Sequence, residues 1–100
     1  MNANEQKVQL DLNSPPFQDE FFEMEVSDLK KLLKTFKKLK SMTWKQVYTD
    51  AGLKWEEIKI NPGFYTIRLS DSCRAIVVRD EQLMRFIHTR VEHDSAYGRK

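Results

Sequence analysis

The last third of the sequence contains three runs of strand-forming residues with short turn signals between them. The runs cover residues 64–70, 73–79 and 83–91 and are rich in Val, Ile, Phe, Tyr and Thr. Asp-Ser at 71–72 and Asp-Glu-Gln at 80–82 separate them. Turn residues between β-rich runs are typical of hairpins. The sequence therefore predicts an antiparallel meander, and the rest of the chain must pack against it.

Two helical patterns precede the meander. Residues 27–41 have the apolar spacing of an amphipathic helix, with Ser27 as the expected N-cap. The apolar stripe of this helix consists of Leu29, Leu32, Leu33, Phe36 and Leu39. Thr43 and Gln46 have capping-box spacing for a second helix, and Gly52 is expected as its left-handed C-cap. Two helices this close in sequence predict a helical hairpin.

The remaining segments complete an α+β fold. Alternating apolar residues over 8–12 predict an N-terminal strand, which the two prolines at 15–16 end. Residues 17–26 fit either a helix or a packed loop. A further strand is expected near Glu57, before the turn signal at 61–63. The predicted architecture is an N-terminal strand and a two-helix hairpin packed on one side of a three- to four-stranded antiparallel sheet.

The turns also predict which side chains share a face of the sheet. If both turns are as short as their signals indicate, strict alternation places Arg74, His88 and Arg90 together. Their face carries most of the apolar strand residues, so the helices are expected to cover it, with Arg68 on the opposite face. A slip of one residue in one strand would separate Arg74 from His88. The pattern leaves open whether Arg74 lies at a covered rim or in an open basic groove.

Length and composition exclude several classes of protein. A chain of 100 residues suits one core, so we expect a single domain over residues 1–100. No apolar run reaches the ~20 residues of a membrane helix, and the N-terminus lacks a secretion-signal pattern. Cys73 is the only cysteine, which excludes an internal disulfide and a CxxC zinc site. We expect a cytoplasmic protein with no membrane contact, no metal and no small-molecule cofactor.

Charge is distributed unevenly along the chain. Residues 30–45 contain seven lysines and no acid, whereas six of the nine basic residues from Ala51 onward are arginines. The lysine run fits a solvated helix face or a surface that contacts RNA or protein. Arginines within strands favour the binding of carboxylate or phosphate.

The segments IRLS at 67–70, CRAIVVRD at 73–80 and VEHDSAYG at 91–98 together resemble the RelE/ParE superfamily of bacterial toxins. Arg74 matches the strand arginine of that family, His93 its tail histidine and Tyr97 its tail tyrosine. The resemblance covers most of the chain and implies a RelE-like fold. It also implies a toxin of a type II toxin–antitoxin system, neutralised by a cognate antitoxin. In the RelE branch such a toxin cleaves mRNA in the ribosomal A site.

The implied cleavage proceeds without metal by attack of the RNA 2′-hydroxyl on the adjacent phosphate, which requires a base, a cation and an acid. Arg74 is the predicted phosphate clamp, and His93 or Tyr97 is predicted to move the proton. The predicted substrate-binding residues are Arg68, His88, Arg90 and Lys54. Among these, His88 is the second choice for the proton transfer.

The same residues have other interpretations. His88 fits a hydrogen-bonded structural histidine, His93 and Tyr97 fit anchors of the chain end, and Arg74 fits a surface ion pair. Asp94 would repel a phosphate, which supports a second hypothesis, a ParE-type toxin that acts on DNA gyrase without nuclease activity. A third hypothesis is a small RNA- or protein-binding adaptor that uses the lysine helix.

Overall fold

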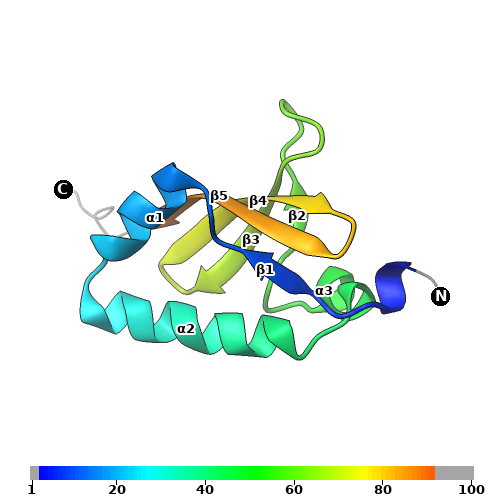
Figure 1. Ribbon diagram of the computed structural model, residues 1–100, viewed down its shortest axis with the longest axis horizontal. Coiled ribbons are helices and arrows are strands. Elements are labelled where there is room, and N and C mark those ends of the chain that lie inside the picture. Colours follow the sequence, from blue (N-terminus) through cyan, green and yellow to red (C-terminus); the bar gives the residue numbers. More distant parts are fainter. Residues whose placement is uncertain (1–2, 92–100) are drawn as a thin grey trace.

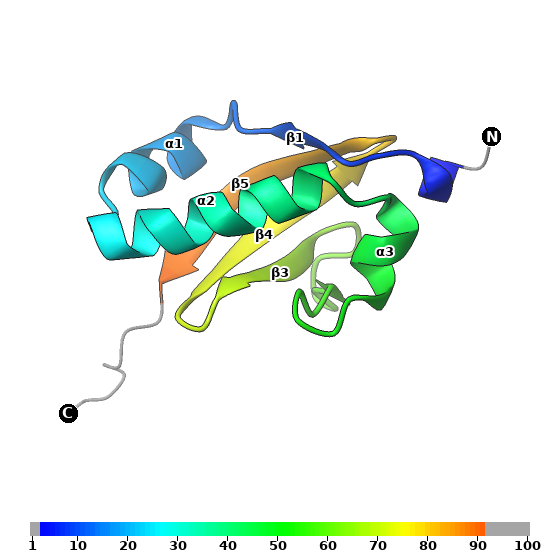
Figure 2. The ribbon, with the colours of Figure 1, turned by 90° about the horizontal axis from the view of Figure 1, so that it is seen from below.

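The computed structural model describes residues 3–91. In chain order the elements are η1 (Ala3–Glu5), β1 (Gln9–Asp11), α1 (Pro15–Phe22), α2 (Val26–Lys40), α3 (Trp44–Thr49), β2 (Glu56–Glu57), β3 (Tyr65–Ser70), β4 (Cys73–Asp80) and β5 (Leu83–Val91). The strands form one sheet in the order β1-β5-β4-β3-β2. α2 lies on one side of this sheet, and the loop before β3 projects on the other (Figure 1; Figure 2).

The predicted α+β class, the N-terminal strand and the meander are confirmed. The sheet has five strands and differs from the prediction in one respect, because it is mixed rather than antiparallel. β1 pairs with β5 in parallel, whereas the other neighbouring strands are antiparallel. Parallel pairing requires a long connection, and the one between these two strands contains all three helices and the strands β2, β3 and β4.

The core lies between the sheet and the helices, and three phenylalanines join the layers. Phe17 of α1, Phe36 of α2 and Phe86 of β5 pack with ring centroids 5.1–6.4 Å apart. This packing explains why residues 15–22 form a helix, which the local sequence left undecided. The two prolines occupy the first helical turn, where their missing N–H groups are tolerated.

Predicted details at the helix ends and on the stripe of α2 differ from the structure. α2 begins one residue before Ser27, and Glu25 is its N-cap. Leu33 of the predicted apolar stripe is 47% exposed, because the buried stripe runs through Leu32, Phe36 and Leu39. The capping box of α3 is confirmed.

The end of α3 was predicted wrongly. The helix ends at Thr49 with Asp50 as its C-cap, and Gly52 does not adopt a left-handed conformation. The Asp50 carboxylate instead accepts a hydrogen bond from the backbone N–H of Leu53 (3.0 Å), which closes the turn.

Two β-bulges determine which side chains face the open side of the sheet. The register shifts by one residue at Leu69 in β3 and again at Ile87 in β5. Each bulge inserts one unpaired residue, so the strand segments beyond it exchange faces relative to an uninterrupted ladder. Consequently Ala75 and Val77 of β4 are buried beneath the helices. The prediction that the helices cover the face of Arg74 is wrong.

Candidate functional site

A row of three arginines crosses the open face of the sheet. Arg74 of β4 pairs directly with Arg68 of β3 and with Arg90 of β5. Opposed residues in neighbouring strands point to the same face, and strands lie ~4.8 Å apart, so the row spans about 10 Å at the backbone. Like charges in opposed positions are destabilising. The row is therefore expected to bind an anion.

The carboxylate partners of these arginines are few. Arg68 lies 3.5 Å from Asp71, whose side chain is 96% exposed. Among residues 3–91, no carboxylate forms an ion pair with Arg74 or Arg90. Arg85 of β5, by contrast, has two carboxylate partners at 3.0 Å. Within residues 3–91, Arg74 and Arg90 thus differ from Arg85, because no carboxylate neutralises their charge.

A cavity of about 350 Å³ adjoins the row. Its lining combines two arginines with apolar and neutral polar side chains, and consists of Ile58, Asn61, Thr66, Arg74, Ala75, Ile76 and Arg90. A cationic end beside an apolar wall suits a ligand with a phosphate and a flat, largely apolar part.

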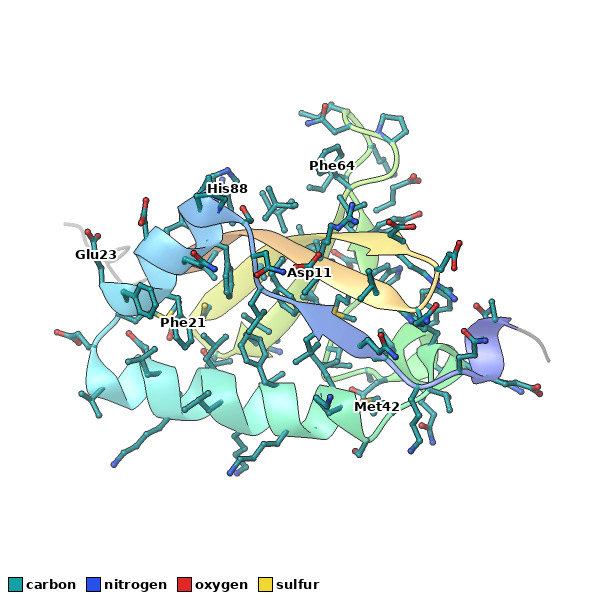
Figure 3. The ribbon with its side chains drawn as sticks, viewed as in Figure 1. Asp11, Phe21, Glu23, Met42, Phe64 and His88 are labelled. Carbon is teal, nitrogen blue, oxygen red and sulfur yellow. The ribbon has the colours of Figure 1, made fainter. Side chains whose placement is uncertain are left out.

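His88 lies beside this cavity, opposite Ile76 and two residues before Arg90. Its Nδ1 is 3.3 Å from one carboxylate oxygen of Glu20 in α1. The other oxygen accepts a hydrogen bond from the backbone N–H of Thr89 at 2.7 Å. α1 thereby occupies the edge of β5 beyond the short strand β1, and Glu20 gives His88 a structural partner. Figure 3 shows His88 and Phe64 on the side of the sheet away from α2.

The remaining predicted site residues lie elsewhere or outside the described range. Lys54 is in the loop before β2, in a left-handed conformation (φ 51°), and is absent from the cavity lining. His93 and Tyr97 lie outside the described residues. β5 ends at Val91, which pairs with Cys73, so the described chain ends in the position next to Arg74.

The prediction missed residues of the cavity wall. Ile58 and Asn61 were not among the predicted site residues, although the turn signal at 61–63 located their loop correctly. The prediction that Ile76 lies on a covered face is wrong, because neither the bulge at Leu69 nor the bulge at Ile87 has a signal in the local sequence.

The described residues provide no metal cluster and no membrane helix. Among residues 3–91, no group of three or more His, Cys, Asp or Glu side chains is arranged to hold a metal ion. No helix in this part of the chain is long and apolar enough to cross a membrane.

The chain has the RelE/ParE-like fold, because solved structures with that fold match it over most of its length. RelE in the archaeal RelE–RelB complex from Pyrococcus horikoshii matches with a TM-score of 0.61 over 88% of this chain and 98% of that chain, at 12% identity. The YoeB/ParE toxin from Agrobacterium tumefaciens matches with a TM-score of 0.57 over 84% of this chain and 98% of that chain, at 16% identity.

YoeB from Staphylococcus aureus, solved as a dimer, is similar with a TM-score of 0.56 over 85% of this chain and 97% of that chain, at 19% identity. No family model and no curated protein matches the sequence. At these identities the likeness concerns the fold, and the activity must be argued from the site itself.

Proposed function

We propose that this protein is the toxin of a type II toxin–antitoxin system, a RelE-like endoribonuclease that cleaves mRNA on the ribosome without a metal ion. The observation that carries the proposal is the row formed by Arg68, Arg74 and Arg90 beside a cavity on the open face. The RelE/ParE-like fold supports it, because RelE and YoeB are among the structural neighbours. A toxin that cleaves mRNA on the ribosome must act in the cytoplasm, so we propose a cytoplasmic location.

The proposed reaction is a transesterification within the RNA. The 2′-oxygen forms a bond to the adjacent phosphorus, the bond from phosphorus to the 5′-oxygen breaks, and a 2′,3′-cyclic phosphate results. Arg74, with Arg68 and Arg90 beside it, stabilises the charge that develops on the phosphate oxygens. His93 or Tyr97 takes the proton of the 2′-hydroxyl or protonates the leaving 5′-oxygen. His88, oriented by Glu20, is the alternative among the described residues.

The proposed protein partner is a cognate antitoxin. Three of the neighbouring proteins were solved as complexes, RelE with RelB, YoeB with YefM and YafQ with DinJ, and the YoeB–YefM complex is a toxin–antitoxin pair. A gene for a small acidic or DNA-binding protein beside the gene for this chain would support the pairing.

Induced expression followed by mapping of mRNA ends in translated messages tests the proposal. Arg74→Ala should reduce cleavage by about 100-fold or more, the cost of losing one preorganised donor to a developing anion. Tyr97→Phe should reduce it if the phenol moves a proton. Lys34→Ala is the matched control, since it removes one positive charge from α2, an exposed position on the other side of the sheet.

The outcomes separate the competing functions. Cleavage that survives both Arg74→Ala and Tyr97→Phe would refute the site assignment. Growth arrest with intact messages and inhibited DNA supercoiling would favour a ParE-type toxin that acts on gyrase. Absence of both effects, together with RNA binding that is lost in Lys34→Ala, would favour the adaptor.

A further inference from the structure

The loop between β2 and β3 is a closed turn that forms one wall of the cavity. The backbone N–H of Asn61 donates to the carbonyl of Ile58 (3.0 Å), and the N–H of Phe64 donates to the carbonyl of Asn61 (3.1 Å). The N–H of Ile58 donates to the carbonyl of Phe64 (2.8 Å). Gly63 has φ 91°, a conformation that side chains disfavour, and its N–H donates to the Glu57 carboxylate (3.3 Å). These bonds hold the backbone of Asn61 in a defined position.

The side chain of Asn61 is left available by this arrangement. It lines the cavity, and within residues 3–91 its amide has no hydrogen-bond partner. An asparagine amide offers two donors and an acceptor side by side, the pattern that pairs with the edge of a nucleobase. Ile58 and Ile76 supply apolar surface in the same cavity.

We propose that this cavity holds one unpaired nucleobase of an RNA strand and that Asn61 reads the edge of that base. The inference rests on the proposed function for the identity of the ligand as RNA. Arg74 and Arg90 line the same cavity, so a phosphate bound by them leaves its nucleotide's base beside Ile58 and Ile76. Sequence-specific recognition of RNA typically uses splayed, unpaired bases that are hydrogen-bonded along their edges.

The loop that forms one wall of the cavity carries further apolar surface. Ile60 is 88% exposed and Phe64 is 39% exposed on the same loop. Phe64 directly precedes β3, and its side chain lies on the side of the sheet away from α2, the side that carries the cavity (Figure 3). A neighbouring base stacks on such an aromatic ring without sequence preference. In this arrangement Phe64 contributes affinity, and Asn61 contributes discrimination.

Binding of uncleavable oligonucleotides tests the subsite directly. The probes are 2′-O-methyl pentanucleotides with abasic sites at all positions except the centre, which carries adenine, cytosine, guanine or uracil. Fluorescence anisotropy should show a difference of about tenfold between the tightest and the weakest base for the unaltered protein, and Asn61→Ala should reduce it to about twofold or less. Asn13→Ala is the matched control, since Asn13 lies in the loop before α1 and, among residues 3–91, its side chain forms a hydrogen bond only with Asp11.

The proposal is overturned if the unaltered protein binds all four probes equally, or if Asn61→Ala retains the discrimination while a thermal melt shows it folded. Its failure is distinct from failure of the proposed function. Base discrimination that depends on Asn61, in a protein that leaves messages intact, would uphold the subsite and refute the nuclease. Cleavage that depends on Arg74 but shows the same base pattern in Asn61→Ala would uphold the nuclease and refute the subsite.

Discussion

Removal of the central charge of the arginine row should make the protein more stable. Arg74 is directly opposed to an arginine on each side. Opposed pairs in a sheet contribute roughly 0.2–1 kcal/mol each, and like charges act against folding. Relief of two such pairs therefore amounts to about 0.4–2 kcal/mol, and we expect the lower half of that range because solvent screens these side chains. Arg74→Met is the appropriate change, since it keeps most of the apolar stem that lies along the sheet.

Urea denaturation at two salt concentrations measures this effect, because urea leaves the ionic strength unchanged. The Debye length falls from ~30 Å at 0.01 M to ~3 Å at 1 M. The gain in the free energy of unfolding should therefore be present at low salt and largely vanish at high salt. A variant that is less stable than the unaltered protein at low salt, or whose gain is the same at both concentrations, would refute the reasoning.

Arg85→Met is the matched control for this experiment. Arg85 lies in the same sheet but forms ion pairs with Asp11 and Asp80, each at 3.0 Å. The identical substitution should therefore lower stability by about 0.5–1.5 kcal/mol, the opposite sign, and salt should reduce the loss. Opposite signs for one chemical change at two arginines would show that the row is maintained for a reason other than stability.

Three further predictions concern stability. Arg79→Ala should lower the free energy of unfolding, measured by urea denaturation, by about 2–4 kcal/mol. The reason is that the Arg79 guanidinium lies 4.3 Å from the centre of the Trp44 ring and donates several hydrogen bonds. A loss below about 1 kcal/mol would contradict this prediction. Thr43→Ala should cost about 1 kcal/mol by removing the capping box of α3, and Thr43→Ser should restore most of it. Acid should also destabilise the fold. The pKa of Asp11 is lowered, mainly by the backbone N–H of Asn13 and also by Arg85, and these effects outweigh the opposite effect of burial. Burial raises the pKa of Asp50, but a lysine and backbone N–H groups outweigh it, so the pKa is lowered. A carboxylate whose pKa is lowered by folding stabilises the fold at pH values above its ordinary pKa of 3.8. That contribution is lost as the pH falls through the pKa of the folded state. We therefore expect Tm to decrease below about pH 4, and Asp50→Asn should make the decrease smaller.

The helices and strands of this protein follow largely from its local sequence. The strand runs, the turns at 71–72 and 80–82 and the capping box of α3 all depend on residues within a few positions of one another. β3 and β4 each differ from the predicted run by one residue at one end, and β5 agrees with it. Strand propensity and turn chemistry are local properties, so a single sequence is enough to predict them.

The face of the sheet that carries the arginine row depends, by contrast, on how the strands pair. The bulges at Leu69 and Ile87 exist because partner strands must bring Ala75, Val77 and Phe86 into one core, a requirement that neither strand expresses alone. The helix at residues 15–22 likewise depends on aromatic contacts with distant elements. Register is a relation between strands, and a shift of one residue reverses every side chain beyond it. The residue types of the site can therefore be predicted from sequence, whereas their convergence on an open face cannot.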